Sequence, residues 1–240
     1  MGSIKLDVDG QLAVVTLDEG ENRFNPDFLA AFLQVLDQVE GETDCRSLVV
    51  TSSHEKIFCN GIDLQWLGSV VMQQDLDAAK AFFYQLNVLL RRLSTYPLIT
   101  VAAINGHVFA GGAIMSCAFD FRFMRSDRGY FCLPEVDLGI PFLPGMNAIL
   151  SKAIPRHTLE LMQLTGKRMT AQECETSHII TQACSLEELM PTALAFAKPL
   201  SKGRAIVGEL KARLTTGIVH AIDVLDVDYI ESGQFQYPDA

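Results

Sequence analysis

The chain has 240 residues, of which 49% are hydrophobic, and a formal net charge of −10 at pH 7. This hydrophobic content predicts an ordered globular protein with one substantial core. The acidic balance argues against nucleic acid and anionic membrane surfaces as partners, since binding to either needs a basic footprint.

The predicted elements of the first half alternate between strands and helices. Residues 4–8 and 12–17 predict a hairpin around Asp9-Gly10. Asn25-Pro26 predicts a helix start, because Asn is a favoured cap and Pro is favoured at the first helical position. The other elements are a strand at 47–51, a helix at 79–93 that stops before Pro97, a strand at 98–104, a helix at 111–118 and strands at 121–124 and 130–132. This alternation predicts an α/β fold with mostly parallel strands.

From about residue 144 the pattern becomes helical. The predicted helices lie at residues 147–153, 157–164, 171–175, 186–197 and 204–214. No segment rich in Pro, Gly or Ser separates the two halves, so we expect one folding unit with a helical C-terminal part.

The six cysteines show neither Cys-x-x-Cys nor zinc-like spacing. They are Cys45, Cys59, Cys117, Cys132, Cys174 and Cys184. Most have apolar neighbours, so we expect buried free thiols in a reducing compartment and no metal site.

The segment from Asn105 to Ile114 carries the strongest local signal. The predicted strand at 98–104 runs into an Asn-Gly turn, and Gly111-Gly112 then opens an apolar helix. Glycine lets a ligand approach main-chain N–H groups, and the first turn of a helix adds partial positive charge. The arrangement suits an oxyanion hole, whereas a phosphate loop would continue with Gly-Lys-Ser/Thr. The alternative is that the glycines serve tight packing alone.

Two further loops share this character. Lys56 to Leu64 follows the predicted strand at 47–51 and places Gly61 where the chain leaves the sheet, and Cys132 to Pro141 puts Glu135 among apolar neighbours. Ligands of open α/β folds bind outside the carboxyl ends of strands, so we expect these loops to meet over one site.

In this order the three segments resemble the crotonase (enoyl-CoA hydratase/isomerase) superfamily. Leu164-Thr165-Gly166-Lys167-Arg168-Met169-Thr170-Ala171 is similar to a fourth segment of that family, and the resemblance runs from the opening hairpin to about residue 180. Asn22-Arg23-Phe24-Asn25-Pro26, Asn60-Gly61-Ile62-Asp63-Leu64 and Arg128-Gly129 with Glu135-Val136-Asp137 look most similar to plant-type Δ3,Δ2-enoyl-CoA isomerases. The resemblance implies a crotonase-like spiral of β-β-α units. It also implies an acyl-CoA-binding core over residues 1–190 and a C-terminal helical segment, residues 191–240, for oligomerisation or active-site cover.

The family stabilises a thioester enolate with two main-chain N–H groups, which by motif position are those of Ile62 and Gly111. Hydratases of the family use two glutamates, and the position of one of them holds Ile114 in this chain, one turn beyond Gly111. Isoleucine cannot hold or move a proton. Glu135 occupies the other position, so the resemblance implies an isomerase rather than a hydratase.

One carboxylate suffices to move a proton between two carbons of the same substrate. The resemblance implies that Glu135 takes a proton from C2 of a 3-enoyl-CoA and returns it to C4, which gives the trans-2-enoyl-CoA. We expect the apolar residues Phe131, Leu133, Val136 and Ile140 to raise the pKa of Glu135 toward useful basicity.

Further residues are candidates for substrate binding. They are Asn60, Gly61, Asp63, Leu64, Trp66, Gly112, Ile114 and Pro134. Two of them have a structural alternative to substrate binding: Asp63 is expected to cap and shape its loop, and Trp66 to pack as part of a helix. Coenzyme A phosphates could meet Arg23, Lys202, Arg204, Lys211 or Arg213, for which solvated surface charge is the alternative.

Two other functions remain open. One is a different crotonase reaction, such as thioester hydrolysis or decarboxylation, and the other is a non-catalytic acyl-CoA-binding module. For each of them the partner is an acyl-CoA, and we expect no separate cofactor because coenzyme A is part of the substrate. The family implies a homotrimer or a dimer of trimers. The C-terminus is not a peroxisomal Ser-Lys-Leu tripeptide, which favours the cytosol.

Overall fold

The computed structural model describes residues 4–233, so residues 234–240 of the predicted C-terminal segment lie outside the described part. The main sheet has the strand order β1-β2-β4-β7-β9-β11. Its strands are β1 (Ile4–Asp9), β2 (Leu12–Leu17), β4 (Ser47–Ser52), β7 (Ile99–Ile104), β9 (Phe121–Arg125) and β11 (Gln182–Cys184). β1 pairs antiparallel with β2, and each later pairing is parallel. The predicted hairpin and mostly parallel sheet are confirmed.

Two small sheets carry the loops that the sequence singled out. One is formed by β10 (Phe131–Cys132), β8 (His107–Phe109) and β5 (Ile57–Cys59), and the other by β3 (Arg23–Phe24) and β6 (Gly61–Ile62). β8 lies where the sequence predicted only a turn and small residues. It forms because the chain after Gly106 pairs with β5 and β10 on either side.

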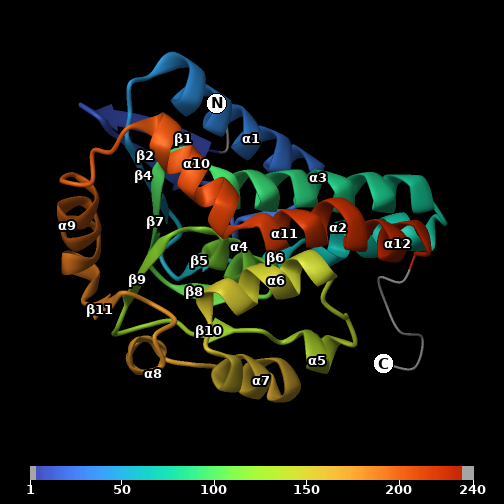
Figure 1. Cartoon of the computed structure of the whole chain (residues 1–240). Helices are drawn as coiled ribbons and strands as arrows, with labels where there is room; N and C mark the ends of the chain where they lie inside the picture. The colour runs from blue at the N-terminus through green and yellow to red at the C-terminus, as the bar shows by residue number, and fades with distance from the viewer. Residues whose placement is uncertain (1–3, 234–240) are drawn as a thin grey trace.

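The helices of the first half are α1 (Pro26–Glu42), α2 (Leu64–Met72), α3 (Leu76–Thr95) and α4 (Gly111–Ala118). α1 and α3 lie side by side, and α3 also contacts α2 and α4 (Figure 1). Asn25 caps α1 as predicted, since its side chain accepts a hydrogen bond from the N–H of Phe28. α3 ends at Thr95, two residues before Pro97, also as predicted. α2 was indicated only by the interpretation of Trp66 as a helix-packing residue, without bounds.

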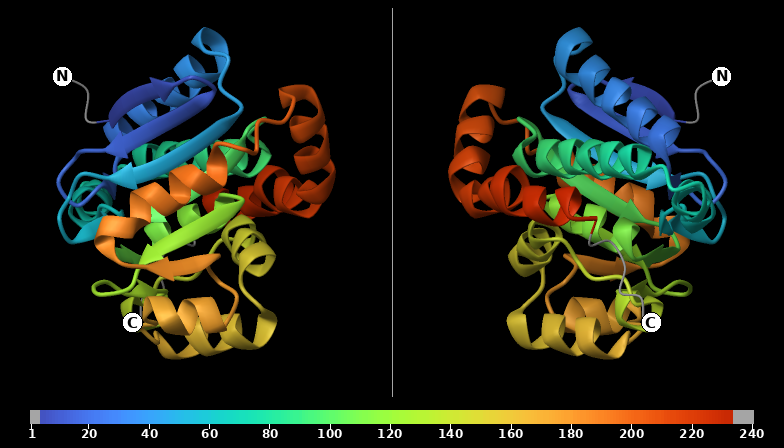
Figure 2. Two further views of the ribbon diagram at one scale, coloured as in Figure 1. Left: turned by 90° about the vertical axis from the view of Figure 1, so that its left-hand side faces the viewer. Right: turned by 90° about the vertical axis from the view of Figure 1, so that its right-hand side faces the viewer.

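The second half is helical, as predicted, and contains more helices than the pattern indicated. Its elements are α5 (Glu135–Leu138), α6 (Pro144–Ala153), α7 (Arg156–Thr165), α8 (Ala171–Thr176), α9 (Leu186–Ala197), α10 (Arg204–Leu214), α11 (Thr216–His220), the π-helical turn η1 (Ala221–Leu225) and α12 (Asp226–Glu231). After residue 214 the resemblance implied a helical segment, but the individual helices α11, η1 and α12 were not predicted. These last helices lie beside α3 and α6 (Figures 1 and 2).

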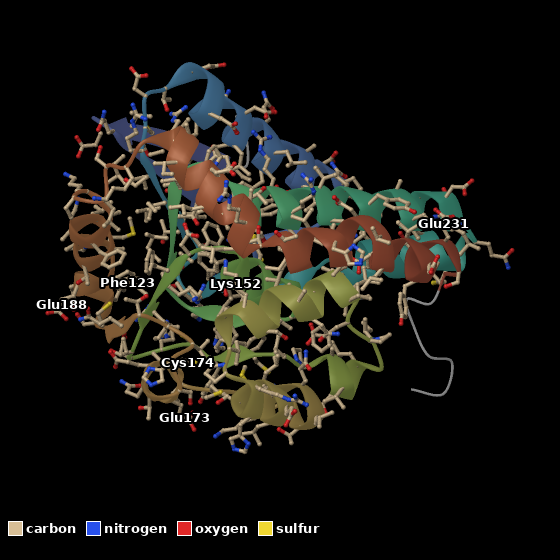
Figure 3. The ribbon with its side chains drawn as sticks, viewed as in Figure 1. Phe123, Lys152, Glu173, Cys174, Glu188 and Glu231 are labelled. Atoms are coloured by element: carbon tan, nitrogen blue, oxygen red, sulfur yellow. The ribbon has the colours of Figure 1, made fainter. Side chains whose placement is uncertain are left out.

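One hydrophobic core runs through both halves. Its buried residues extend from Ile4 in β1 to Ile230 in α12. A second, smaller cluster lies between the other face of the sheet and α9, where Phe123 packs on Phe196 at a ring-centroid distance of 5.2 Å (Figure 3). All six cysteines are buried and free, as expected. Within residues 4–233 no helix is long and apolar enough to cross a bilayer.

Candidate active site

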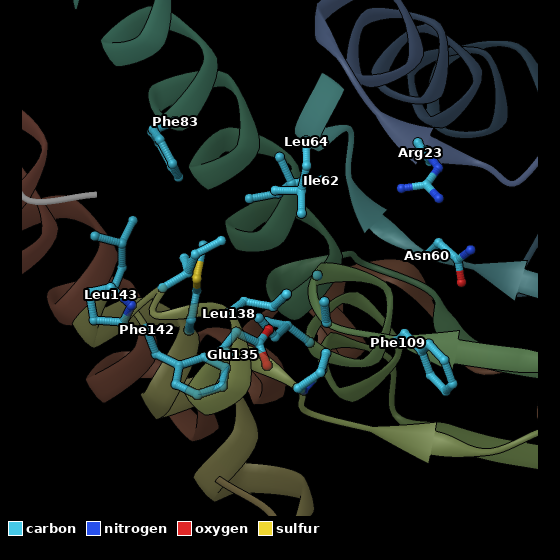
Figure 4. A pocket seen from close by; sticks show the side chains of 17 residues that line it. Arg23, Asn60, Ile62, Leu64, Phe83, Phe109, Glu135, Leu138, Phe142 and Leu143 are labelled. Atoms are coloured by element: carbon cyan, nitrogen blue, oxygen red, sulfur yellow. The ribbon is translucent and has the colours of Figure 1, made fainter. Parts of the chain in front are cut away.

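A cavity of about 210 Å³ lies where the three predicted loops meet (Figure 4). Its lining includes Ile62 of β6, Gly111 of α4 and Glu135 of α5. The remaining lining residues are Arg23, Asn60, Leu64, Phe83, Phe109, Ala110, Ile114, Pro134, Leu138, Ile140, Pro141, Phe142, Leu143 and Met146. The structure thus brings the predicted catalytic residue and both predicted oxyanion positions to one cavity.

The cavity has a polar end and an apolar end. Arg23, Asn60 and Phe109 lie together at one end, and Phe83, Phe142 and Leu143 lie at the other (Figure 4). Glu135 lies between the two ends. An elongated ligand with one polar and one apolar part fits this arrangement.

Glu135 is the first residue of the short helix α5 and is only 7% exposed. Its Oε2 is buried and has no hydrogen-bond partner among the described residues. Burial raises the pKa of Glu135 to about 7, because a charged carboxylate is poorly solvated there. The expected rise of the pKa is confirmed, and a carboxyl group with this pKa can both accept and donate a proton near neutral pH.

The loops that hold Ile62 and Gly111 touch through their backbones. Gly61 has φ +73°, and a Cβ atom there would lie 2.4 Å from the nitrogen of Gly111. A Cβ atom on Gly112 would lie 2.4 Å from the carbonyl oxygen of Cys59. Gly61 and Gly112 do not line the cavity, and their lack of a Cβ atom lets the two loops pack together. For Gly112 this is the packing role that the sequence left open as an alternative. Gly111 is the first residue of α4, and the N–H groups of a first helical turn have no acceptor within the helix.

Ile114 follows Gly111 by one turn, and both residues line the cavity, as the spacing predicted. Ile114 is 2% exposed. Among the described residues that line the cavity, Glu135 is the only carboxylate and Arg23 is the only other charged side chain. The cavity wall therefore provides one proton-carrying group.

Asp63 and Trp66 lie outside the cavity lining. Asp63 caps α2, where its side chain accepts hydrogen bonds from the N–H groups of Gln65 and Trp66. Trp66 packs on Phe82 of α3 at a ring-centroid distance of 4.9 Å. Both residues thus have the structural positions that the sequence offered as alternatives to substrate contact.

Three of the basic candidates for phosphate binding are engaged elsewhere. Arg204 donates to carbonyl groups around the end of α1, including that of Thr43. Lys211 is buried and pairs with Asp120, and Arg213 pairs with Glu209 on its own helix. Arg23 alone of the named candidates lines the cavity.

The residues that organise the polar end were not predicted from the sequence. Glu21 accepts hydrogen bonds from both Arg23 and Asn60. The fully buried Asn22 donates to Ser52 and to the carbonyl group of Phe58, and its side-chain oxygen accepts from the N–H of Glu19. A polar pair before a helix cap is too common in sequences to have indicated these contacts.

Comparison with known proteins agrees with this geometry. The family model for enoyl-CoA hydratase/isomerase matches residues 7–228. The chain is 31% identical to enoyl-CoA delta isomerase 3 of Arabidopsis thaliana over 206 residues, 82% of this chain and 84% of that relative. It is also 31% identical to a putative enoyl-CoA hydratase of Thermus thermophilus over 200 residues, 80% of this chain and 76% of that relative.

Among solved structures, an enoyl-CoA hydratase/isomerase family protein from Pseudomonas syringae superposes with a TM-score of 0.87 at 23% identity, covering 95% of this chain and 97% of that one. The mixed α/β architecture is thus the crotonase fold, as predicted. The chain belongs to the enoyl-CoA hydratase/isomerase family.

Proposed function

We propose that this enzyme is an enoyl-CoA isomerase that moves the double bond of a 3-enoyl-CoA to the trans-2 position. The observation that carries the proposal is the single carboxylate of the cavity: Glu135 is buried there, and the wall at Ile114 is apolar. The resemblance implies that the position of Ile114 is the one that holds the second acid of a hydratase. The 31% identity to a protein named enoyl-CoA delta isomerase 3 supports the same reaction.

In the proposed reaction, the Glu135 carboxylate takes a proton from C2 of the substrate. The electron pair of that C–H bond delocalises over the dienolate, and negative charge develops on the thioester oxygen. The N–H groups of Ile62 and Gly111 donate hydrogen bonds to this oxygen, which stabilises the intermediate. Glu135 then returns the proton to C4, so the product is an isomer of the substrate and the enzyme is regenerated.

The surroundings of Glu135 fit this role. Its pKa of about 7 makes it a stronger base than an exposed glutamate, while it can still be protonated at neutral pH. The apolar end of the cavity favours an unsubstituted hydrocarbon chain, since a polar substituent there would be desolvated without a partner. Coenzyme A enters as part of the substrate in this proposal, and Arg23 is the charged group at the polar end of the cavity. The trimeric assembly, the C-terminal segment as its interface or cover, and the cytosolic location stay predictions.

The experiment uses the purified protein with cis-3-hexenoyl-CoA and with trans-2-hexenoyl-CoA. Isomerisation of the first substrate creates the conjugated thioester and its absorbance, and hydration of the second removes it. We expect the first reaction and no appreciable rate for the second. Release of free thiol would indicate a hydrolase, and fast hydration would show that the single-carboxylate argument is wrong.

A further inference from the structure

A second buried carboxylate lies outside the active site. Asp226 is the first residue of α12, directly after the π-helical turn η1, and it is fully buried with 0% exposure. Its Oδ1 accepts a hydrogen bond from the N–H of Gly145 at 2.7 Å, and its Oδ2 accepts one from Nδ2 of Asn87 at 2.9 Å. Burial of a carboxylate is unfavourable unless hydrogen bonds replace its lost hydration, and these two bonds provide that compensation.

Both partners of Asp226 are neighbours of residues that line the apolar end of the cavity. Gly145 lies on α6 between the lining residues Leu143 and Met146, and Asn87 follows the lining residue Phe83 by one turn of α3. Asp226 therefore connects α3 and α6, and residues of both helices line this end of the cavity, where Figure 4 shows Phe83 and Leu143.

The contact leaves no room for a side chain at Gly145. A Cβ atom on Gly145 would lie 2.6 Å from Oδ2 of Asp226 and 2.5 Å from Cγ1 of Ile222. Gly145 is the second residue of α6, so the carboxylate also meets the positive end of that helix. A charged acceptor binds such an N–H more strongly than a neutral one.

The segment that presents Asp226 is itself fixed to α3. Glu231 at the end of α12 accepts hydrogen bonds from Lys80 and Tyr84 of α3 (Figure 3), and Asp223 of η1 pairs with Arg91. The C-terminal segment thus holds Asp226 between α3 and α6, and none of its described residues lines the cavity.

We propose that Asp226 is a positioning residue that sets the length of acyl chain accepted by the cavity, by fixing the start of α6 against α3. The inference rests on the proposed function only in taking the apolar end as the acyl site. Without this link Leu143 and Met146 are free to move away from Phe83, and the cavity accepts longer chains with less discrimination.

The test compares Asp226→Ala and Asp226→Asn with the unaltered protein. Binding of saturated acyl-CoAs of four to twelve carbons is measured by calorimetry. Steady-state isomerisation of unsaturated acyl-CoAs of the same lengths is followed in parallel, which separates effects on KM from effects on kcat. Saturated thioesters cannot isomerise, so the binding arm is independent of the proposed reaction.

We expect Asp226→Ala to reduce the affinity ratio between the preferred length and its longer neighbours by about tenfold, a value within the range for one methylene in an apolar pocket. The turnover of the shortest substrate should stay within about twofold, since its chain does not reach the apolar end. Asp226→Asn should have a smaller effect. Its carbonyl oxygen can accept from Gly145. Once the Asn87 amide turns over, the new amide group can donate to Oδ1 of Asn87, which is buried and has no partner among the described residues.

The matched control is Asp228→Asn, the same change at an exposed position of the same helix. It should leave the chain-length ratio unchanged. If Asp226→Ala does not fold, Asn87→Leu removes one donor while it preserves side-chain bulk, and it should relax the ratio in the same direction. An unchanged ratio, or a uniform loss of affinity at every length, would overturn the proposal. Absence of isomerisation by the unaltered protein, with the chain-length ratio of binding still relaxed in Asp226→Ala, would instead count against the proposed function and leave this proposal standing.

Discussion

Gly61 and Gly111 touch through their backbones, with room for no side chain between them: a Cβ atom on Gly61 would lie 2.4 Å from the nitrogen of Gly111. One glycine belongs to the loop that carries Ile62, and the other opens α4. The spacing of the two proposed oxyanion donors is therefore set by direct backbone contact. This relationship makes the site sensitive to a single methyl group.

Replacing Gly61 by Ala should separate the loops and impair catalysis more than stability. The new Cβ atom would clash with Gly111, and φ +73° is unfavourable for alanine by about 1 kcal/mol. We expect kcat to fall by roughly 10²-fold, the effect of losing one oxyanion donor. The control is Gly68→Ala in α2, where a Cβ atom meets nothing within 4 Å and alanine is the better helix former. Equal activity of the two variants would argue against the role of the backbone contact.

Replacing Ile114 by Glu places a second carboxylate on the cavity wall. Two carboxylates in one buried site repel each other, so the pKa of Glu135 should rise further above about 7. We expect slower isomerisation at neutral pH, a pH–rate profile shifted upward and measurable hydration of a 2-enoyl-CoA. Ile114→Gln has a similar size and polarity without the charge, so it should slow isomerisation without the upward shift. An Ile114→Glu enzyme with an unshifted pH profile would show that the two positions do not interact.

The Glu135 carboxylate should destabilise the folded protein above neutral pH. Its folded-state pKa of about 7 lies above the ordinary value of 4.5, so between these pH values the folded state binds more protons than the unfolded chain. The free energy of unfolding therefore falls as the pH rises through this range, by up to roughly 3 kcal/mol.

Glu135→Gln removes this titration and should be more stable than the unaltered protein at about pH 8, with the advantage lost below about pH 5. Thermal unfolding across this pH range tests the prediction. Glu160→Gln, the same change at an exposed position of α7, is the control. A stability difference that does not vary with pH would mean that the pKa of Glu135 is not raised.

The side chain of Asn22 should stabilise the polar end of the cavity. It is fully buried, makes three hydrogen bonds and has φ +52°. Asn22→Gly keeps the backbone conformation accessible and removes only the side-chain bonds, so we expect a loss of about 1–3 kcal/mol. Asn22→Ala adds backbone strain of about 1 kcal/mol, so its loss should be larger. Denaturant unfolding of the three proteins separates the two effects, and a stability of Asn22→Gly equal to that of the unaltered protein would contradict the account.

The sequence predicted the parts of the fold that depend on local patterns. Asn25-Pro26 indicated the start of α1 because capping is a local interaction, and periodic apolar residues indicated α3. The start of α2 was not predicted, because Asp63 was interpreted as a residue that caps and shapes its loop, whereas its side chain caps a helix.

The candidate site was predictable to the extent that short motifs placed Glu135, Ile62 and Gly111 in one cavity. The apolar end of the cavity could not be predicted, because Phe83 and Met146 come from helices that meet only through tertiary packing. The contacts of Asp226 could not be predicted for the same reason, since its partners Asn87 and Gly145 are distant in the sequence. No local pattern distinguishes such a buried acid from a solvated one.

The most direct test of the single-carboxylate mechanism follows the proton itself. A 3-enoyl-CoA carrying two deuterium atoms at C2 is converted in ordinary water under single-turnover conditions, and the product is examined for deuterium at C4. The account predicts that a measurable fraction of the product carries deuterium at C4, and that Glu135→Gln abolishes turnover. Product without deuterium at C4, formed by a Glu135→Gln variant that remains active, would contradict it.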